Sequence, residues 1–315
     1  MIKTLQKIST RGMERSAWLA HRRLHIGGSD AAAIVGMSQY ATPYSVWAEK
    51  TGLVSEKPDN EAMRLGRDLE EYVAKRFTEA TGKKVRRENN IIVNPDYPFA
   101  HANVDRVIIG EDALLECKTT SVLNLRHFKG TEFPEKYYCQ CVHYLAVTGC
   151  QRIYLAVLVL GVEFKTYCLE RDEGEIAALM AAEFDFWRHV DEGVPPPVDG
   201  SRATTTALEE VVGEGDQDAP DADLMAMEGY LREYRDMKAV KEQADKRMDE
   251  AANHIKEFMG DSWKGSTGAF TVSFKPQSRS SFDTKAFTKD HPDIDMSAYY
   301  KTTITRPFKV SYKED

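Results

Sequence analysis

The chain has 315 residues, of which 42% are hydrophobic and 29% charged, so it has the composition of a globular protein and the length for two domains. Its longest apolar stretch, residues 153–162, is too short to cross a bilayer, and its N-terminus lacks the apolar core of an export signal, which predicts a cytoplasmic protein with no membrane span. A net charge of −8 argues against a surface coated with nucleic acid but leaves room for a local basic channel.

The first 192 residues alternate between helical and extended patterns. We predict helices near residues 13–24, 29–36 and 42–51, and a longer helix over residues 60–81. Strands follow at residues 90–93, 102–109 and 113–119, then a helix over residues 134–149, strands at 152–160 and 163–170, and a helix to about residue 192. This order predicts an α/β domain with a central mixed sheet flanked by helices.

Acidic residues concentrate between positions 191 and 223, together with a run of three prolines, so we predict an acidic linker over residues 193–222. Outside this segment the chain is nearly neutral, and basic residues stand out at Arg11, Arg15, Arg22, Arg23 and in the run at 83–87. The five cysteines are odd in number and scattered, which predicts reduced thiols and disfavours an iron–sulfur cluster; they are Cys117, Cys139, Cys141, Cys150 and Cys168.

A third segment, residues 223–315, is predicted to be a small α+β extension. Residues 221–259 place apolar side chains at helical spacing, and residues 269–274 and 302–310 are strand candidates. The long helix also alternates basic and acidic residues around its apolar stripe. Such a helix either packs on another protein surface, for assembly or partner docking, or covers the small sheet of its own domain.

The strands at 102–109 and 113–119 carry acidic residues within apolar surroundings. If the turn is centred on Gly110 and Glu111, Asp105 lies opposite Glu116 with Cβ atoms about 5 Å apart, which is destabilising unless a cation offsets it. Lys118 shares the face of Glu116, where it can orient water or stabilise charge on a phosphate. The alternative is a solvated hairpin with a chance Glu-x-Lys, which the apolar neighbours disfavour.

Three further side chains are candidates for the same site. Glu70 shares a helix face with Ala74 and Phe77, so it points inward, either as a third carboxylate or as an edge residue paired with an arginine. Gln140 and Tyr144 are one helical turn apart and can bind a water and a phosphate. For these two the blander interpretation, a polar helix edge, is slightly favoured.

Five segments in this order resemble the YqaJ-type viral recombinases, the lambda-exonuclease-like family of PD-(D/E)xK nucleases. They read WLAHRRLHIGGSD (18–30), GRDLE (66–70), NVD (103–105), LECK (115–118) and YCQCVHYLAVTG (138–149). The resemblance spans roughly residues 10–190. It implies a restriction-endonuclease-like core and a Mg²⁺-dependent enzyme, with Mn²⁺ as a substitute, that digests double-stranded DNA from 5′ to 3′. The product is a 3′ single-stranded tail for phage-type recombination.

The resemblance also assigns residues. Asp105, Glu116 and the carbonyl of Cys117 match the metal ligands, Glu70 the outer carboxylate of the metal site, and Lys118 the catalytic lysine. A second cation, reached by Glu70, would stabilise the leaving oxygen.

Two further positions match the part of the family that grips a 5′-terminal phosphate. They are Arg22 and Ser29, and a guanidinium with a hydroxyl at a helix start suits that role. Gln140 matches the first glutamine of a Gln-x-Gln pattern. Val142 departs from the second glutamine, and Asn103-Val104 replaces a proline-containing lead into Asp105.

Relatives imply a homo-oligomer, in some cases a ring trimer threaded by DNA, and a phage-type single-strand-annealing protein as partner. Two alternatives stay open. One is an endonuclease or structure-specific nuclease on the same fold, which would not need the end-binding residues. The other is a non-catalytic recombination scaffold, for which the loss of a metal ligand would be the signature. The expected ligands are all present in this sequence.

Overall fold

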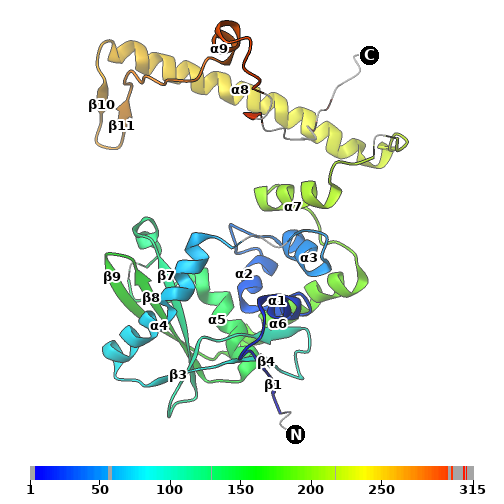
Figure 1. The fold of residues 1–315 in the computed structure, drawn as a ribbon, viewed down its shortest axis with the longest axis vertical. Coiled ribbons are helices and arrows are strands. Elements are labelled where there is room, and N and C mark those ends of the chain that lie inside the picture. The colour runs from blue at the N-terminus through cyan, green and yellow to red at the C-terminus, as the bar shows by residue number, and fades with distance from the viewer. Residues whose placement is uncertain are drawn as a thin grey trace. The chain divides into compact units, whose positions relative to one another are not determined.

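The computed structural model describes residues 4–55, 59–128, 130–216, 218–296, 299–300, 308 and 310. The chain divides into two compact units, Met1–Gly213 and Glu214–Asp315 (Figure 1). The predicted α/β architecture with a C-terminal extension is confirmed.

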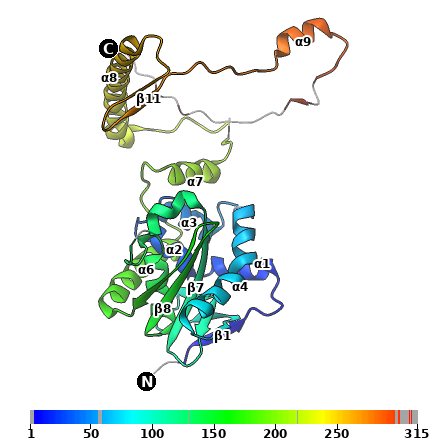
Figure 2. The same ribbon diagram turned by 90° about the vertical axis from the view of Figure 1, so that its left-hand side faces the viewer.

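A five-stranded mixed sheet forms the centre of the first unit, in the order β3-β6-β7-β8-β9. Its strands are β3 (Val85–Arg87), β6 (Arg106–Ile108), β7 (Ala113–Thr120), β8 (Arg152–Val159) and β9 (Glu163–Glu170). β7 and β8 are parallel, and the other neighbours are antiparallel. Helix α4 (Glu61–Thr81) packs on one face of this sheet (Figure 2) and α5 (Glu135–Thr148) on the other (Figure 1).

A second, four-stranded sheet was not anticipated from the sequence. It has the order β1-β4-β5-β2, with β1 (Gln6–Ser9), β4 (Asn90–Val93), β5 (Ala100–Ala102) and β2 (Ile26–Gly27). Residues of β2, β4 and β5 pack in the main core with α2 (Gly28–Ile34), α3 (Pro43–Thr51), α5 and α6 (Glu173–Glu192). The short helix α1 (Arg15–Arg23), labelled in Figure 2, and the 3₁₀ segment η1 (Val122–Phe128) also belong to this unit.

The helix ends follow from local chemistry. The Asn60 side chain accepts a hydrogen bond from the Met63 amide at 2.9 Å and so caps α4. Gly82 and Gly149 end α4 and α5 in the left-handed region, with φ of +72° and +77°, a conformation that glycine adopts without steric cost. Both ends agree with the prediction.

The strand predicted over residues 102–109 is wrong as a single element. β5 ends at Ala102 and β6 begins at Arg106, and the two strands belong to different sheets. Asp105 lies in the bend between them, where its side chain accepts a hydrogen bond from the Cys117 amide at 2.8 Å. The Asp105 carboxylate thus accepts a hydrogen bond that a backbone carbonyl of the neighbouring strand would otherwise accept from the Cys117 amide. The backbone hydrogen bonds to β7 therefore stop at this bend.

Part of the predicted linker is also structured. Helix α7 (Arg202–Val212) falls within residues 193–222 and packs on α3. Its Thr204 hydroxyl is buried and lies 2.8 Å from the hydroxyl of Thr42, and Ala207 is buried beside it. The acidic residues of α7, Glu209 and Glu210, remain exposed. A segment of acidic composition can thus still form a helix that buries one small apolar face. The first unit therefore extends to Gly213.

The second unit contains the predicted long helix. A 3₁₀ turn, η2 (Met225–Met227), leads into α8 (Glu228–Met259), followed by the hairpin β10 (Lys264–Ser266) and β11 (Thr271–Ser273) and by α9 (Thr284–Asp290). β11 confirms the strand expected near residues 269–274. The candidate strand at 302–310 lies almost entirely outside the described residues. Within the described ranges, no helix offers an apolar stretch that would reach across a bilayer.

All five cysteines are free thiols, as predicted. Cys139 and Cys141 are buried on α5, and burial raises the pKa of both thiols. Cys168 is the exposed one, on β9. The buried thiols therefore act as small apolar side chains of the core.

Candidate active site

Asp105 and Glu116 face each other at the end of the β6–β7 hairpin. The strands pair with Arg106 opposite Leu115. Carrying this register one residue further places Asp105 opposite Glu116, as the sequence predicted. The hydrogen bond from the Cys117 amide to Asp105 fixes this carboxylate against β7.

The Glu116 carboxylate is buried, with 3% of the residue exposed. Its Oε1 atom accepts hydrogen bonds from Lys118 Nζ at 2.6 Å and from Gln140 Nε2 at 2.7 Å. Its Oε2 atom is buried without a hydrogen-bond partner. Because an unpaired buried carboxylate oxygen is costly, this atom marks a place where a further positive group fits.

Side chains alternate along β7 between two environments. Leu115 and Cys117 pack toward α4, whereas Glu116 and Lys118 lie on the side of α5. Lys118 Nζ lies 5.4 Å from the centre of the Tyr137 ring on that helix. The alternation puts the polar residues that the sequence singled out on one face. We call Asp105, Glu116 and Lys118 the hairpin cluster.

The charges of the hairpin cluster act on one another. Burial and the carboxylates of Glu116 and Glu70 raise the pKa of Asp105 well above its usual value. Burial on its own would lower the pKa of Lys118, but the carboxylates of Glu116 and Asp105 outweigh it and raise that pKa. The acids therefore repel one another while the lysine stays charged, an arrangement that a cation would stabilise.

Glu70 projects from α4 and is held by an arginine. Arg106 is 2% exposed and binds the carboxylate of Glu70, that of Glu71 at 3.1 Å and the carbonyl of Asp105 at 2.8 Å. The arginine-paired alternative for Glu70 is thus realised, although Glu70 still adds to the negative charge around Asp105. Arg106 was not predicted from the sequence. A basic residue directly after Asp105, at the start of an apolar strand, could have indicated this role.

The oxygen donors fit a hard divalent cation. Asp105, Glu116 and the carbonyl of Cys117 offer the carboxylate and carbonyl oxygens that Mg²⁺ prefers, and Glu116 Oε2 has no partner. Among the residues that the structure describes, no three His, Cys, Asp or Glu side chains converge as a ready-made metal cluster. Two carboxylates form the centre of the candidate site, and Glu70 stands outside it.

Arg22 and Ser29 come together at the start of α2. Arg22 Nη2 donates hydrogen bonds to Ser29 Oγ at 3.1 Å and to Asp30 Oδ1 at 3.4 Å, and the guanidinium lies 5.3 Å from the centre of the Trp18 ring. A guanidinium and a hydroxyl presented together suit a phosphate. We call Arg22, Ser29 and Asp30 the α2 cluster.

A buried ion pair holds the α2 cluster in place. Lys50 Nζ, from α3, lies 2.6 Å from Asp30 Oδ2 and donates to the Arg22 carbonyl at 2.8 Å. Burial opposes ionisation of Asp30, but Lys50 and Arg22 lower its pKa to about 2. Neither Asp30 nor Lys50 was predicted. Asp30 ends the GGSD segment, which could have identified it, whereas nothing in the sequence around Lys50 marks that residue.

Tyr144 connects the two clusters. Its hydroxyl accepts a hydrogen bond at 3.0 Å from Gln140, which also donates to Glu116. Its ring covers Gly28, where an added Cβ would lie 2.7 Å from Tyr144 Cε1. Helix α5 packs against both α2 and β8 (Figure 1). It therefore carries a chain of side-chain contacts from Glu116 through Gln140 and Tyr144 to Gly28, the residue before Ser29.

The basic run at residues 83–87 forms β3 and the residues before it. Lys83 forms an ion pair with Glu111, and Arg87 donates to Glu71 at 2.8 Å. Part of the positive charge of the run is therefore neutralised by neighbouring carboxylates.

The family model described as "YqaJ-like viral recombinase domain" matches residues 17–151 of this chain. That range contains the hairpin cluster, the α2 cluster, Glu70 and Gln140. The relative described as "Uncharacterized protein YqaJ" of Bacillus subtilis (strain 168) is 38% identical over 286 residues, which cover 90% of each chain. Because 286 residues exceed the length of the first unit, this similarity includes part of the second unit as well.

The fold is shared with a solved structure. An alkaline exonuclease, LHK-Exo of Laribacter hongkongensis, aligns with a TM-score of 0.50 and 22% identity over 57% of this chain and 94% of that one. LHK-Exo in complex with dAMP gives a TM-score of 0.50 and 21% identity. At this identity the likeness establishes the fold alone, and it confirms the predicted nuclease-type core. Because it is 38% identical to YqaJ over 90% of each chain and matches the family model, the chain belongs to the YqaJ-like viral recombinase family.

Proposed function

We propose that the protein is a Mg²⁺-dependent exonuclease that degrades double-stranded DNA from 5′ to 3′ and leaves 3′ single-stranded tails for recombination. The hairpin cluster carries this proposal, because two opposed carboxylates, one with an unpaired buried oxygen, lie beside a charged lysine. Membership of a viral recombinase family and the fold of an alkaline exonuclease support it. Mn²⁺, which takes similar oxygen ligands, should replace Mg²⁺.

Each residue of the hairpin cluster has a distinct role in this proposal. Asp105, Glu116 and the carbonyl of Cys117 would hold the cation. Bound Mg²⁺ supplies charge that polarises the scissile phosphate and makes water more acidic. Lys118 stabilises the negative charge that develops on the phosphate oxygens, because its own charge is maintained by its neighbours.

Two further residues act on the cluster from outside it. Gln140 holds the Glu116 carboxylate in position through its hydrogen bond of 2.7 Å. Glu70 is restrained by Arg106, so we propose that it serves as an outer carboxylate with a smaller effect on the rate.

The α2 cluster favours an exonuclease over an endonuclease. We propose that Arg22 and Ser29 bind the 5′-terminal phosphate, which carries more charge than an internal one and competes better with Asp30 for Arg22. The path through Tyr144 and Gln140 links this contact to the hairpin cluster. LHK-Exo, which shares the fold, forms a complex with dAMP, a nucleoside monophosphate.

The test compares linear and covalently closed circular duplex of the same sequence in Mg²⁺. We expect the linear DNA to be degraded, the circle to stay intact and EDTA to stop the reaction. Cleavage of the circle at a comparable rate would establish an endonuclease. Stable DNA in both cases, with binding retained, would establish a scaffold without catalysis.

For the whole protein we propose a cytoplasmic homo-oligomer, with the ring trimer of some relatives as one arrangement, and a phage-type single-strand-annealing protein as partner. The C-terminal segment, residues 223–315, is proposed to serve assembly or docking, because both clusters lie in the first unit.

A further inference from the structure

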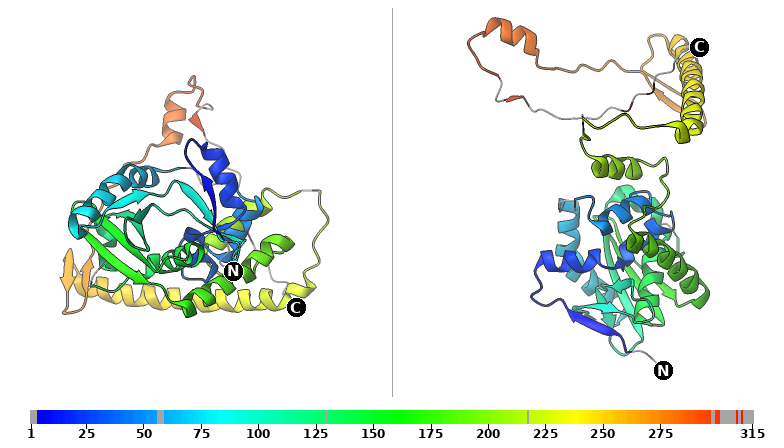
Figure 3. Two further views of the ribbon diagram at one scale, coloured as in Figure 1. Left: turned by 90° about the horizontal axis from the view of Figure 1, so that it is seen from below. Right: turned by 90° about the vertical axis from the view of Figure 1, so that its right-hand side faces the viewer.

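Helix α8 carries an apolar stripe along its whole length. Apolar or small side chains recur at alternating intervals of three and four residues from Met227 to Phe258, with Lys241 as the exception. This spacing has a period of 3.5 residues, the signature of a coiled-coil seam. The helix is continuous over 32 residues, about 48 Å (Figure 3).

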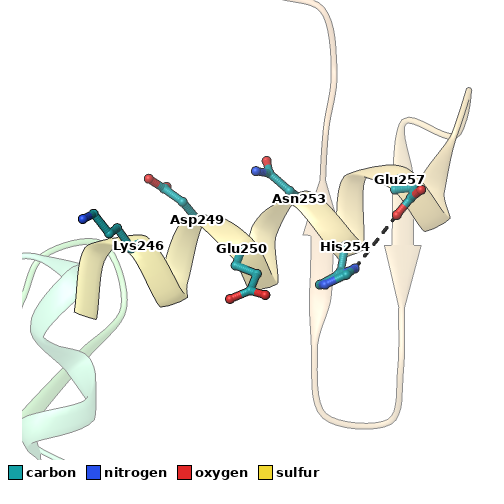
Figure 4. Close-up of a pocket in the computed structure, with 6 residues that line it drawn as sticks. All are labelled: Lys246, Asp249, Glu250, Asn253, His254 and Glu257. Carbon is teal, nitrogen blue, oxygen red and sulfur yellow. Dashed lines mark ion pairs between the residues drawn. The ribbon is translucent and has the colours of Figure 1, made fainter. Parts of the chain in front are cut away.

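The stripe is exposed in the structure. No residue of α8 is buried among the described residues, and the exposed fractions reach 71% at Tyr230, 64% at Met248 and 94% at Phe258. Outside the stripe, charged and polar side chains predominate, and Val240 is an exposed apolar exception at 55%. Figure 4 shows part of that surface, formed by side chains that all lie outside the seam: Lys246, Asp249, Glu250, Asn253, His254 and Glu257.

We propose that α8 pairs with α8 of a second copy of this chain in a two-stranded antiparallel coiled coil, with its twofold axis between residues 242 and 243. The first position of each heptad is then held by Met227, Tyr234, Lys241, Met248 and Ile255. The fourth position is held by Tyr230, Met237, Ala244, Ala251 and Phe258. In an antiparallel pair, each first position faces a fourth position of the other helix.

The sizes of the side chains favour this orientation. In the antiparallel pair, Tyr234 faces Ala251 of the second copy, and Lys241 faces Ala244, so each alanine of the seam meets a long side chain. The lysine stem can run over the alanine and bring its ammonium to solvent. In a parallel pair each alanine would face an alanine and leave a gap, and Lys241 would face another Lys241.

The charges beside the seam are compatible with the antiparallel pair. Lys238 would lie opposite Asp245 of the second copy, and Glu233 opposite His254. A parallel pair would also bring opposite charges together, Glu233 with Lys238. The flanking charges thus permit both orientations, and the core layers decide between them.

Among the described residues, a ring contact touches the seam without filling it. The ring of Phe308 lies 5.6 Å from that of Tyr234, but the two residues remain 76% and 45% exposed. This contact leaves the seam open to a second helix.

Disulfide trapping in the full-length protein tests the orientation. Cys168→Ser removes the exposed native thiol, and Tyr234→Cys and Ala251→Cys are introduced in separate chains of different tag length. After oxidation, we expect a cross-linked heterodimer in the mixture and little cross-linking of either variant alone. Cross-linking of Ala251→Cys alone as strongly as the mixture would show a parallel pair, and no cross-link in any sample would show that α8 does not pair. Either result overturns the proposal.

A charge test in the full-length protein separates pairing through α8 from any assembly of the first unit. Met237 and Met248 face each other across the proposed pair, so Met237→Glu with Met248→Glu should halve the mass measured by light scattering. Met237→Glu with Met248→Lys should keep the larger mass, because the antiparallel pair then joins opposite charges, whereas a parallel pair would join like charges. The control, Lys246→Glu with Asn253→Glu, changes only the outer face and should keep the larger mass. An unchanged mass in the double glutamate variant would overturn the proposal.

Discussion

Glu116 is buried with one carboxylate oxygen satisfied twice and the other not at all. Together with the opposed Asp105, this is an arrangement that costs stability in the protein without a cation. Residues that cost folding energy and lie beside a charged lysine are typical of a site selected for chemistry. Removing the charge of Glu116 should therefore lower the nuclease activity while leaving the stability unchanged or raising it.

The substitution Glu116→Gln tests this opposition. The amide oxygen can still accept from Lys118 and Gln140, but the repulsion with Asp105 is removed, so we expect an unchanged or higher melting temperature and nuclease activity lower by about 100-fold or more. Glu170→Gln, at an exposed position of the edge strand β9, should change neither quantity. A Glu116→Gln enzyme that digests linear DNA at the wild-type rate would remove Glu116 from the active site.

Asp30 makes the stability of the α2 cluster dependent on pH. Its pKa in the folded protein is about 2, below the ordinary value of 3.8, so the ionised form stabilises the fold by about 2 kcal/mol. This contribution is complete above pH 3.8 and is lost as the pH falls toward 2. We expect Asp30→Asn to lower the free energy of unfolding at pH 7 by at least this amount, measured by urea denaturation, because Lys50 also loses its partner.

A matched comparison identifies the cause of that effect. Asp59 also has a lowered pKa, from its hydrogen bond with Arg67, but it is solvent-exposed, so Asp59→Asn should change stability little. The difference in the free energy of unfolding between wild type and Asp30→Asn should narrow as the pH is lowered from 4 toward 2. A difference in the free energy of unfolding that does not change with pH would contradict the role assigned to the Asp30 carboxylate.

At the scale of elements, the longer pieces of the first unit were predictable because their signals are local. Caps and glycines give the ends of α4 and α5, and strand alternation with a glycine turn gives the register that puts Asp105 opposite Glu116. The hairpin cluster follows from this register, so its geometry could be read before the fold was known.

Other elements were not predictable because their causes are tertiary. β2 has two residues and exists through its pairing with β5, and β1 pairs with β4 across more than 80 positions of sequence. The split of residues 102–109 depends on a side-chain hydrogen bond, and the burial of Lys50 depends on the packing of α3 against α2. Helix α7 was hidden by the acidic composition around it.

The contact between α2 and α5 gives a prediction for one glycine. Gly28→Ala would place a Cβ 2.7 Å from Tyr144 Cε1, so the ring must move, and we expect a loss of stability of about 1–3 kcal/mol and slower digestion of linear DNA. Gly66→Ala is the matched change within α4, where the nearest atom would be 3.7 Å away. It should be neutral in stability or stabilising by up to about 1 kcal/mol. Equal melting temperatures for the two variants would contradict the close packing of Tyr144.

At the scale of the whole molecule, the two units should separate at Gly213 and not earlier. A chain ending at Gly213 keeps α7 and should cut short linear duplexes at a rate close to that of the full protein. A chain ending at Gly200 loses the buried contact of Thr204 with Thr42 and the burial of Ala207, and should be less stable by about 1–3 kcal/mol. Thermal denaturation and the initial rate of digestion measure both effects. Loss of activity in a folded chain ending at Gly213 would place part of the active site in the second unit.

In the proposed reaction, the hairpin cluster hydrolyses DNA from a 5′ end held by the α2 cluster. The most direct measurement is the release of label from a blunt linear duplex in Mg²⁺, with the label at the 5′ or the 3′ terminus and the 5′ terminus bearing a phosphate or a hydroxyl. We predict early release of the 5′ label, faster with the phosphate, and a smaller phosphate effect in Arg22→Ala. Early release of the 3′ label, or equal rates for both 5′ termini in the wild type, would contradict the account.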